Sequence, residues 1–590
     1  MKTNIFNKVK ATAKGFLPFY LFTLLPLMAS CMNFEPEAEM SDVQVWNSPA
    51  NFQLFANQFY GYTRDITSST TYQSSVNDGP HSDLRSDLCC GSTNNVYSSG
   101  TNAVPEKDGN YTSLYTRIYY TNLLLDRAAS YSDPSAIAVP VAEAKFFRAY
   151  CYFELVQLYG NVILVTKPLD LNSPELQASR NDRSEVIDQC VRDLQEAVTG
   201  LPEKANEAGR LTKDAARAFL SRVALYEGTW QKFHNGGAEA TANSERVKSL
   251  LSTAKQAAKE VIEGNRWSLF YNSDLDTESY RYMFILEDEK CNPANLTTAD
   301  NKEYILARRH RLEDGCGYNI TKTYAANAVF PTRKLAQMYL CQDGLPYGVS
   351  TTYPENYSSM TSEFTGRDNR MLTTLLPNGT QYWDNTNNNS RTAWDTSDAS
   401  RAKTASVITN SGYQTHKWAV ERKVTDTKEA MDYPVIRYAE VLLNFAEATF
   451  ELNEGTISNS DLDKSLNLVR QRVNKSMPKL SNELVNNNGL SMREEIRRER
   501  TVELVFEGFR VDDLKRWYTA STEMPQDLLG VKYDGTVFET VWPGQTHPRN
   551  ADGCIIMYSN RTWAERNYLY PLPSDQRQLN PNLGQNPGWE

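Results

Sequence analysis

Few residues in this chain belong to the patterns that mark common catalytic sites. Its 590 residues include only five histidines, and none of them has the H-E-x-x-H spacing of a zinc protease. A G-x-S-x-G nucleophile motif, a phosphate-binding loop and a dinucleotide-binding fingerprint are also missing. These absences argue against metalloproteases, α/β-hydrolases, P-loop nucleotidases and nicotinamide-dependent dehydrogenases.

Cysteine is scarce as well. Nine cysteines are present, and none shows the C-x-x-C or Cys/His spacing of a zinc site. Cys151 and Cys190 lie inside helical patterns, so we expect free, buried thiols at these two positions. A disulfide among the loop cysteines stays open; these are Cys89, Cys90, Cys291, Cys316, Cys341 and Cys554.

Positive charge is in deficit. Lysine and arginine number 62 against 72 aspartates and glutamates, and four of the lysines lie in the first 30 residues, which contain no acid. The remaining chain therefore has 58 basic against 72 acidic residues. Proteins that bind nucleic acid need a basic surface for the phosphate backbone, so we expect no nucleic-acid partner.

The first 30 residues have the composition of an export signal. Four lysines precede an apolar run over residues 15–28, which is short for a membrane span and contains Pro18 and Pro26. Ala29 and Ser30 then precede Cys31. This order resembles a lipoprotein signal, which predicts acylation of Cys31 and an acidic tether over residues 31–47. An ordinary secretory signal that happens to contain Cys31 is the alternative.

Helical periodicity dominates residues 48–264. Apolar residues recur three or four positions apart, and Ser48 before Pro49 marks the first helix start. Glycines predict where several helices end, including Gly160, Gly200 and Gly228. We expect helices, packed as antiparallel pairs, over residues 51–64, 111–131, 143–159, 182–198, 213–226 and 246–263.

Residues 265–432 lack this periodicity. Asn, Ser, Thr, Gly, Tyr and Trp replace the apolar stripes, and the strands that we predict are short, over residues 303–307 and 433–436. A long loop-rich insertion on a helical scaffold is usually functional. We therefore expect the ligand-binding region in this insertion.

The helical scaffold resumes over residues 433–590. In residues 434–451 the apolar face leaves only Arg437, Glu440, Asn444 and Glu447 as a polar edge, which predicts a helix buried among others. Further helices are expected over residues 462–473 and after a capping box formed by Ser491 and Glu494. We interpret the charged cluster at residues 493–500 as ion pairing between helices.

Five long segments of the chain resemble the SusD/RagB family of outer-membrane nutrient-binding lipoproteins, and so do C-Q-D-G-L-P-Y-G at residues 341–348 and F-T-G-R-D-N-R-M-L at residues 364–372. Two are A-E-A-K-F-F-R-A-Y-C-Y-F-E-L-V-Q-L-Y-G at residues 142–160 and G-R-L-T-K-D-A-A-R-A-F-L-S-R-V-A-L-Y at residues 209–226. The others are residues 434–451, residues 496–517 and the tail Y-P-L-P-S-D-Q-R-Q-L-N-P-N-L-G-Q-N-P-G-W at residues 570–589. The resemblance implies a mainly α-helical fold, in which a TPR-like helical scaffold (a SusD-like α-α superhelix) holds a large irregular insertion.

The same resemblance implies a function. It predicts a lipid-anchored protein on the outer membrane, facing the cell exterior, that binds a nutrient such as an oligosaccharide and uses no cofactor. The protein would pass this ligand, without catalysis, to a SusC-like TonB-dependent transporter that it covers as a lid. Two alternatives stay open: a surface glycoside hydrolase, and a helical adaptor without a small-molecule ligand.

Candidate ligand contacts follow from the chemistry of sugars. A sugar ring has an apolar C–H face that a Trp or Tyr ring can cover, and hydroxyls that Arg, Asn or Asp can bind. Members of the resembling family place such residues in loops from residues 82–97 and from the insertion. The predicted contacts are Arg85, Asn95, Tyr97, Tyr318, Trp383 and Trp394. Further aromatic residues in the insertion are Tyr280, Tyr282, Tyr382, Tyr413 and Trp418.

The acidic residues do not mark a clear catalytic or metal-binding site in the sequence. A glycosidase needs two carboxyl groups that converge on one bond, and most acids here lie beside Lys or Arg on helical faces. We predict no metal ion, and a structural calcium ion at Asp300–Asn301 or Asp384–Asn385 stays an open alternative.

Overall fold

A computed structural model gives the fold of the chain. It describes residues 46–66, 80–236, 244–289, 291–311, 320, 329–378, 381–382, 403–404, 410–420 and 429–590. Within these ranges, Ser48–Glu590 forms one compact unit. Cys31, Tyr318, Trp383 and Trp394 lie outside the described residues, so what the sequence predicts for them stays a prediction.

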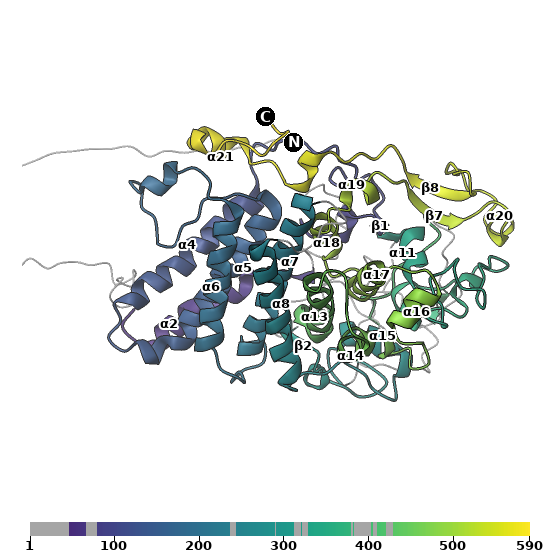
Figure 1. Ribbon diagram of the computed structural model, residues 1–590, viewed down its shortest axis with the longest axis horizontal. Coiled ribbons are helices and arrows are strands. Elements are labelled where there is room, and N and C mark those ends of the chain that lie inside the picture. Colours follow the sequence, from purple (N-terminus) through teal and green to yellow (C-terminus); the bar gives the residue numbers. More distant parts are fainter. Residues whose placement is uncertain are drawn as a thin grey trace, which may run out of the picture. The chain divides into compact units, whose positions relative to one another are not determined.

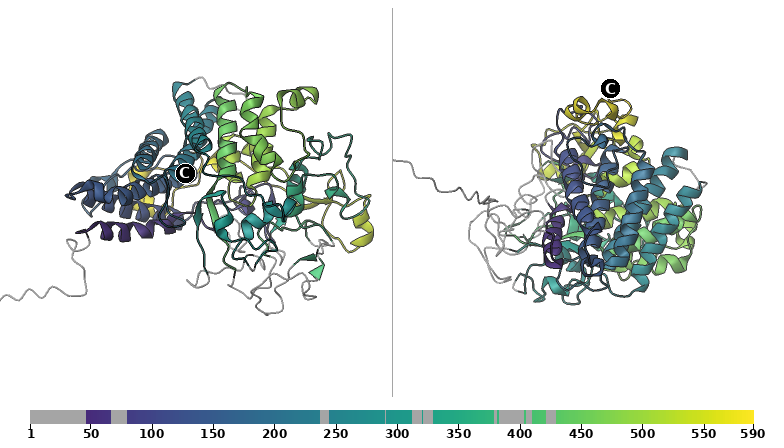
Figure 2. Two further views of the ribbon diagram at one scale, coloured as in Figure 1. Left: turned by 90° about the horizontal axis from the view of Figure 1, so that it is seen from below. Right: turned by 90° about the vertical axis from the view of Figure 1, so that its left-hand side faces the viewer.

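Six helices form the scaffold of residues 48–264. They are α2 (Pro49–Asn57), α4 (Gly109–Ala129), α5 (Ala138–Tyr159), α6 (Arg183–Gly200), α7 (Lys213–Gly236) and α8 (Glu245–Glu263). From α4 to α8, each helix packs against its successor (Figures 1 and 2). The predicted cap is present, because the Ser48 hydroxyl accepts a hydrogen bond from the N–H of Asn51 at 3.3 Å.

One predicted helix end is wrong. α7 does not stop at Gly228 but continues to Gly236. A Cβ atom at position 228 would lie 3.1 Å from Leu251 Cδ2 and 3.3 Å from Leu250 Cβ, both on α8. Gly228 therefore marks a close approach of α7 to α8, where a side chain has little room, and not the end of a helix.

Residues 433–452 form a strand and then a helix. The two predicted strands are present as β2 (Tyr304–Arg308) and β6 (Tyr433–Arg437). They pair with each other in an antiparallel sheet, and α13 (Tyr438–Leu452) follows β6 at once. The helix thus begins four residues later than its predicted start at residue 434, because the Tyr438 N–H donates to the carbonyl of Glu303 at 2.8 Å. The predicted burial of this helix is confirmed, since its residues from Tyr438 to Glu451 are all buried.

The polar edge of α13 is buried in ion pairs. Glu440 binds the guanidinium of Arg222 on α7 at 2.6 Å, and Glu447 binds Arg516 on α18 (Arg510–Arg516) at 2.5 Å. Arg500 binds Asp513 at 2.8 Å, which confirms that the charged cluster at residues 493–500 pairs with other helices. Burying so many charges is tolerated only because each has a partner of opposite sign.

The rest of the described chain contains short elements. The helices are α9 (Ser279–Ile285), α11 (Arg333–Met338), α12 (Asn369–Thr374), α14 (Asn459–Asp463), α15 (Leu466–Gln471), α16 (Asn482–Asn487), α17 (Met492–Leu504), α18 (Arg510–Arg516), α19 (Ala520–Glu523), α20 (Val537–Val541) and α21 (Ser574–Leu579). The strands are β1 (Cys89–Cys90), β3 (Phe330–Pro331), β4 (Gln381–Tyr382), β5 (Lys403–Thr404), β7 (Leu528–Lys532) and β8 (Cys554–Tyr558), paired as β1–β3, β4–β5 and β7–β8.

Most aromatic residues of the insertion that the structure describes belong to the core. Tyr280, Tyr282, Tyr413 and Trp418 are at most 3% exposed. The indole N–H of Trp418 donates to the carbonyl of Phe506 at 3.1 Å. These four rings are therefore not available for stacking on a ligand.

The C-terminal tail returns to the first helices. The Tyr570 N–H donates to the carbonyl of Leu158 at 2.7 Å, and the Asn586 side chain donates to the carbonyls of Tyr159 and Tyr570 at 3.0 and 2.7 Å. In Figure 1 this tail, which contains α21, runs along the end of the helical scaffold. The C-terminal tail is thus hydrogen-bonded to the end of α5.

The described residues contain eighteen α-helices and only short strands, so the predicted mainly helical fold is confirmed. None of these helices has the length and hydropathy of a membrane span. Cys151 and Cys190 are free and buried, as predicted. Of the other cysteines in the described part of the chain, Cys89, Cys90, Cys341 and Cys554 are also free thiols.

Candidate functional site

The loop of residues 82–97 is held by two later segments of the chain. After the turn η2 (Asp83–Arg85), the Thr332 N–H donates to the carbonyl of Leu88 at 2.9 Å and its hydroxyl to that of Asp87 at 3.0 Å. The carboxylate of Asp83 accepts from the N–H of Phe506 at 2.5 Å. Burial raises the pKa of Asp83 to about 7, although this hydrogen bond opposes the shift.

Three predicted ligand contacts are used to shape this loop. The Arg85 guanidinium lies 3.8 Å from the centre of the Tyr97 ring and donates to the Tyr570 hydroxyl at 2.8 Å. Asn95 accepts from the N–H groups of Tyr97 and Ser98 at 3.0 and 3.1 Å. Arg85 is only 3% exposed, and Asn95 and Tyr97 are half-buried. The contacts place these residues together, and their binding of a ligand stays a prediction.

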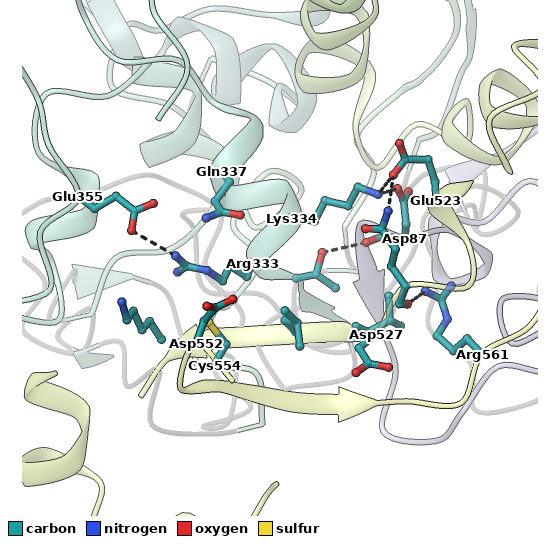
Figure 3. Close-up of a pocket in the computed structure, with 15 residues that line it drawn as sticks. Asp87, Arg333, Lys334, Gln337, Glu355, Glu523, Asp527, Asp552, Cys554 and Arg561 are labelled. Carbon is teal, nitrogen blue, oxygen red and sulfur yellow. Dashed lines mark hydrogen bonds and ion pairs between the residues drawn. The ribbon is translucent and has the colours of Figure 1, made fainter. Parts of the chain in front are cut away.

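A charged cleft of about 360 Å³ opens beside the loop (Figure 3). Its walls come from the loop, α11, α19 and the hairpin of β7 and β8. The lining residues are Asp87, Thr332, Arg333, Lys334, Gln337, Glu355, Glu523, Gln526, Asp527, Leu528, Leu529, Lys532, Asp552, Cys554 and Arg561.

Lys334 links two carboxylates in this cleft. Its ammonium lies 2.6 Å from Asp87 and also contacts Glu523, as Figure 3 shows. Asp87 accepts two further hydrogen bonds of 2.8 Å from Arg510. Burial alone would raise the pKa of Asp87, but Arg510 and Lys334 outweigh it and hold this pKa well below its usual range. Asp87 is therefore ionised and does not serve as a general acid.

Two arginines complete the walls. Arg333 donates to the hydroxyl of Tyr357 at 2.6 Å. Arg561 donates to the carbonyls of Ser98, directly after the loop, and of Gln526, shortly before β7, at 2.8 and 2.7 Å. Burial lowers the pKa of Arg561 to about 10, so the guanidinium is still charged at neutral pH.

The chemistry of the cleft suits a ligand with many hydroxyl groups. Asp527, Lys532 and Asp552 line it without an ion-pair partner among the described residues, so they can exchange hydrogen bonds with such a ligand. No aromatic residue is in the lining, so a ring-stacking platform would have to come from a neighbouring segment. Trp383 and Trp394, the predicted platforms, lie outside the described residues.

One of the two cation sites that the sequence left open, Asp300–Asn301, lies in the described part of the chain. The carboxylate of Asp300 accepts hydrogen bonds from the N–H and hydroxyl of Thr297 at 2.8 and 2.9 Å, which caps a short turn. In the ranges that the structure describes, no three His, Cys, Asp or Glu side chains converge as metal ligands do. Asp384 and Asn385 lie outside these ranges.

Two family profiles match this chain, and together they include residues of the helical scaffold and of the cleft. Residues 290–589 match the profile of the SusD family, and residues 35–225 match a second profile, described as "Starch-binding associating with outer membrane". The chain belongs to the SusD family. The resemblance inferred from the five segments is confirmed.

Individual relatives agree with this assignment. A SusD-like protein of Formosa agariphila is 24% identical over 552 residues, which cover 89% of this chain and 95% of the relative. Another from that organism is 31% identical over 172 residues, which cover 28% of this chain and 32% of that protein. The match therefore spans about a third of the length of this second relative.

Solved structures share the fold. A SusD-like carbohydrate binding protein from Bacteroides fragilis superimposes with a TM-score of 0.68 at 24% identity, covering 91% of this chain and 99% of that one. A SusD homologue from Bacteroides thetaiotaomicron gives 0.60 at 19% identity, covering 93% and 99%. The SusD-like fold thus extends over nearly the whole chain.

Sequence reasoning did not find most of the cleft. Lys334, Lys532 and Arg561 have no sequence pattern that separates them from the other charged residues of the chain. They line the same cleft as Asp87 only because segments hundreds of residues apart pack together. The loop of residues 82–97, where the sequence predicts ligand contacts, contributes one residue to the cleft, Asp87.

Proposed function

We propose that this SusD-family protein binds a glycan at the cell surface and delivers it to a SusC-like TonB-dependent transporter in the outer membrane. The observation that supports this most directly is the match of residues 290–589, which contain most of the charged cleft, to the SusD family. The carbohydrate-binding relative with the same fold and the outer-membrane wording of the second profile support the same role.

The cleft and the adjoining loops are the proposed ligand site. Arg333, Lys334 and Lys532 offer donors, and Asp527 and Asp552 offer acceptors. Arg, Lys and carboxylate groups bind sugar hydroxyls in this way, while Tyr97, Trp383 and Trp394 are the proposed stacking residues. Acyl chains on Cys31 would hold the protein at the membrane, since two or more chains give stable anchoring.

Isothermal titration calorimetry against a panel of glycans tests the binding role. The panel contains maltooligosaccharides, xylan, galactomannan, arabinan, pectic galactan and mucin glycans. We expect saturable binding of at least one member, and weaker binding of that glycan by Lys334→Ala. This substitution leaves Asp87 paired with Arg510. Lys248→Ala, which removes an exposed lysine of α8, is the matched control and should bind like wild type.

Each rival function predicts a different result. Release of reducing ends from a glycan would identify a hydrolase. Absence of binding across the panel, together with stable association with a barrel, would identify an adaptor. Either result would overturn glycan delivery as the function.

A further inference from the structure

His81 lies directly before the loop of residues 82–97, and a carboxylate lies at each of its ring nitrogens. Nδ1 is 3.0 Å from the carboxylate of Asp512 on α18, and Nε2 is 3.1 Å from that of Glu154 on α5. The residue is only 1% exposed. One imidazole ring thus joins the start of the loop to two helices that are far apart in the sequence.

Both carboxylates at this ring are ionised. Burial alone would raise the pKa of Glu154, but Arg64 and His81 outweigh it and hold this pKa well below its usual range. Burial would also raise the pKa of Asp512, and His81 with Arg64 lowers it instead. An ionised carboxylate only accepts hydrogen bonds. Each nitrogen of the ring must therefore carry a proton to bond its partner, and a ring with both protons is the imidazolium ion.

The ion pairs of this cluster are complete when His81 is protonated. Arg64 binds the same two carboxylates, Glu154 at 2.7 Å and Asp512 at 3.3 Å, and all four residues are buried. With the imidazolium, two cations therefore face two anions. With a neutral ring, one of the two hydrogen bonds is lost and a buried carboxylate loses a charged partner, which is costly in the protein interior.

The ring is placed to set the position of the loop. Ser82 follows His81 at once and caps the turn η2, whose last residue is Arg85. The guanidinium of Arg85 lies 3.8 Å from the centre of the Tyr97 ring. Asp87 of the same loop lines the charged cleft. The hydrogen bonds of His81 thus fix the start of the segment that carries a predicted stacking residue and part of the cleft wall.

Other charged groups near the ring titrate at similar pH and have to be distinguished from it. Lys515 on α18 interacts with Asp512 and Arg85, and burial lowers its pKa to about 8. Asp83, on the same segment as His81, has a pKa that burial raises to about 7. Both groups remain when position 81 is substituted, so such a substitution isolates the contribution of the ring.

We propose that His81 is a positioning residue of the ligand site, whose protonated ring anchors the loop of residues 82–97, so that glycan binding weakens as the pH rises. The sign follows from the hydrogen bonds. Deprotonation removes one of the two, the start of the loop loosens, and Tyr97 and Asp87 are held less firmly for a ligand. The inference rests on the proposed glycan binding, and it adds a proton-dependent control of the same site.

Hydrogen–deuterium exchange of the full chain at pH 6.0 and pH 8.5 tests the anchor. Rates are corrected for the intrinsic effect of pH, and a peptide from α7 reports overall stability. In wild type, exchange of residues 82–97 should rise at least fivefold at pH 8.5 relative to that peptide. His81→Gln is neutral at both pH values and should exchange fast at both. His81→Lys keeps a cation between the carboxylates, so its loop should stay protected at both.

His234→Gln is the matched control. Burial lowers the pKa of His234 to about 4, so this ring is neutral at both pH values and its loss should leave the pH response of the loop unchanged. Equal exchange of the wild-type loop at the two pH values would overturn the inference. So would a wild-type pH response in His81→Gln or His81→Lys, and either variant decides alone if the other does not fold.

Calorimetric titration of the best-binding glycan connects the anchor to binding. The affinity of wild type should fall at least fivefold from pH 6.0 to pH 8.5, and that of His81→Lys by less than twofold. If the loop responds to pH and the wild-type affinity does not, the inference fails while glycan binding stands. If no glycan binds at either pH, the proposed function fails together with the effect on affinity, and the exchange data alone decide whether the ring anchors the loop.

Discussion

Lys417 donates a hydrogen bond of 2.7 Å from its ammonium group to the carboxylate of Glu507, and both side chains are buried. Arg437 holds the same carboxylate through two more bonds of 2.7 and 2.8 Å. Burial lowers the pKa of Lys417 to about 8, although Glu507 opposes the shift. The protein thus keeps a lysine in its interior that is easier to deprotonate than a lysine in water.

Lys417 should make stability rise with pH on the alkaline side. Between the pKa of about 8 in the folded state and 10.5 in the unfolded chain, the unfolded state binds more protons. The free energy of unfolding therefore increases with pH, by up to about 1.4 kcal/mol per pH unit from one group. Lys417→Met should remove this contribution, because Arg437 still neutralises Glu507. Urea unfolding at pH 7.5, 8.5 and 9.5 checks this, and equal slopes for both proteins would contradict it.

Glu447 should stabilise the fold through its ionised form. It accepts hydrogen bonds from Arg516 and from the indole of Trp517 at 2.7 Å. Burial would raise its pKa, but Arg516 outweighs it and holds the pKa at about 2. This contribution is complete above the unfolded value of 4.5 and is lost as pH falls toward about 2. Glu447→Gln should lower the free energy of unfolding at pH 7 by about 3 kcal/mol.

The control for Glu447 is a glutamate on the surface. Glu196 pairs with Lys145, and its side chain is 55% exposed. Glu196→Gln should therefore change the free energy of unfolding by no more than about 1 kcal/mol. Denaturant unfolding of both variants at pH 7 and pH 4 makes the comparison. If Glu447→Gln and Glu196→Gln lose equal free energies of unfolding, the buried pair of Glu447 and Arg516 stabilises the fold no more than an exposed pair does.

The sequence predicts the helical scaffold well because helices leave a local signal. The apolar stripe of α13 and the cap at Ser48 are both visible within a few residues. Trp418 has no such signal, since its indole bonds to Phe506, 88 positions away. The ion pair of Asp87 with Arg510 spans 423 positions. Contacts of this range depend on packing, which a periodic pattern does not encode, so the cleft was not predicted from its charges.

Acylation of Cys31 stays a prediction that one substitution can test. Cys31→Ala should leave the protein unprocessed or soluble, because the thiol that receives the lipid is gone. Labelled palmitate fed to growing cells should appear in the wild-type protein and not in the variant. Equal labelling of the two proteins would exclude Cys31 as the lipidated residue.

The stacking residues can be identified by comparing affinity with stability. We expect at least one of Tyr97, Trp383 and Trp394 to cover a sugar ring. Substitution of that residue by alanine should cost about 2 kcal/mol of binding, or about thirty-fold in affinity. Its melting temperature should stay near that of wild type, because a ring whose role is to cover a sugar fills no space in the protein core.

Trp418→Ala is the matched control for this comparison. Trp418 is fully buried against α9 and Phe506, so its loss should leave a cavity and lower stability by roughly 3–5 kcal/mol. Calorimetric affinity for the best-binding glycan and the melting temperature are measured for all four variants. If Tyr97→Ala, Trp383→Ala and Trp394→Ala all bind like wild type, or all melt early like Trp418→Ala, the three residues are not the platform. The glycan would then stack elsewhere, while membership of the SusD family, which rests on the whole chain, would be unaffected.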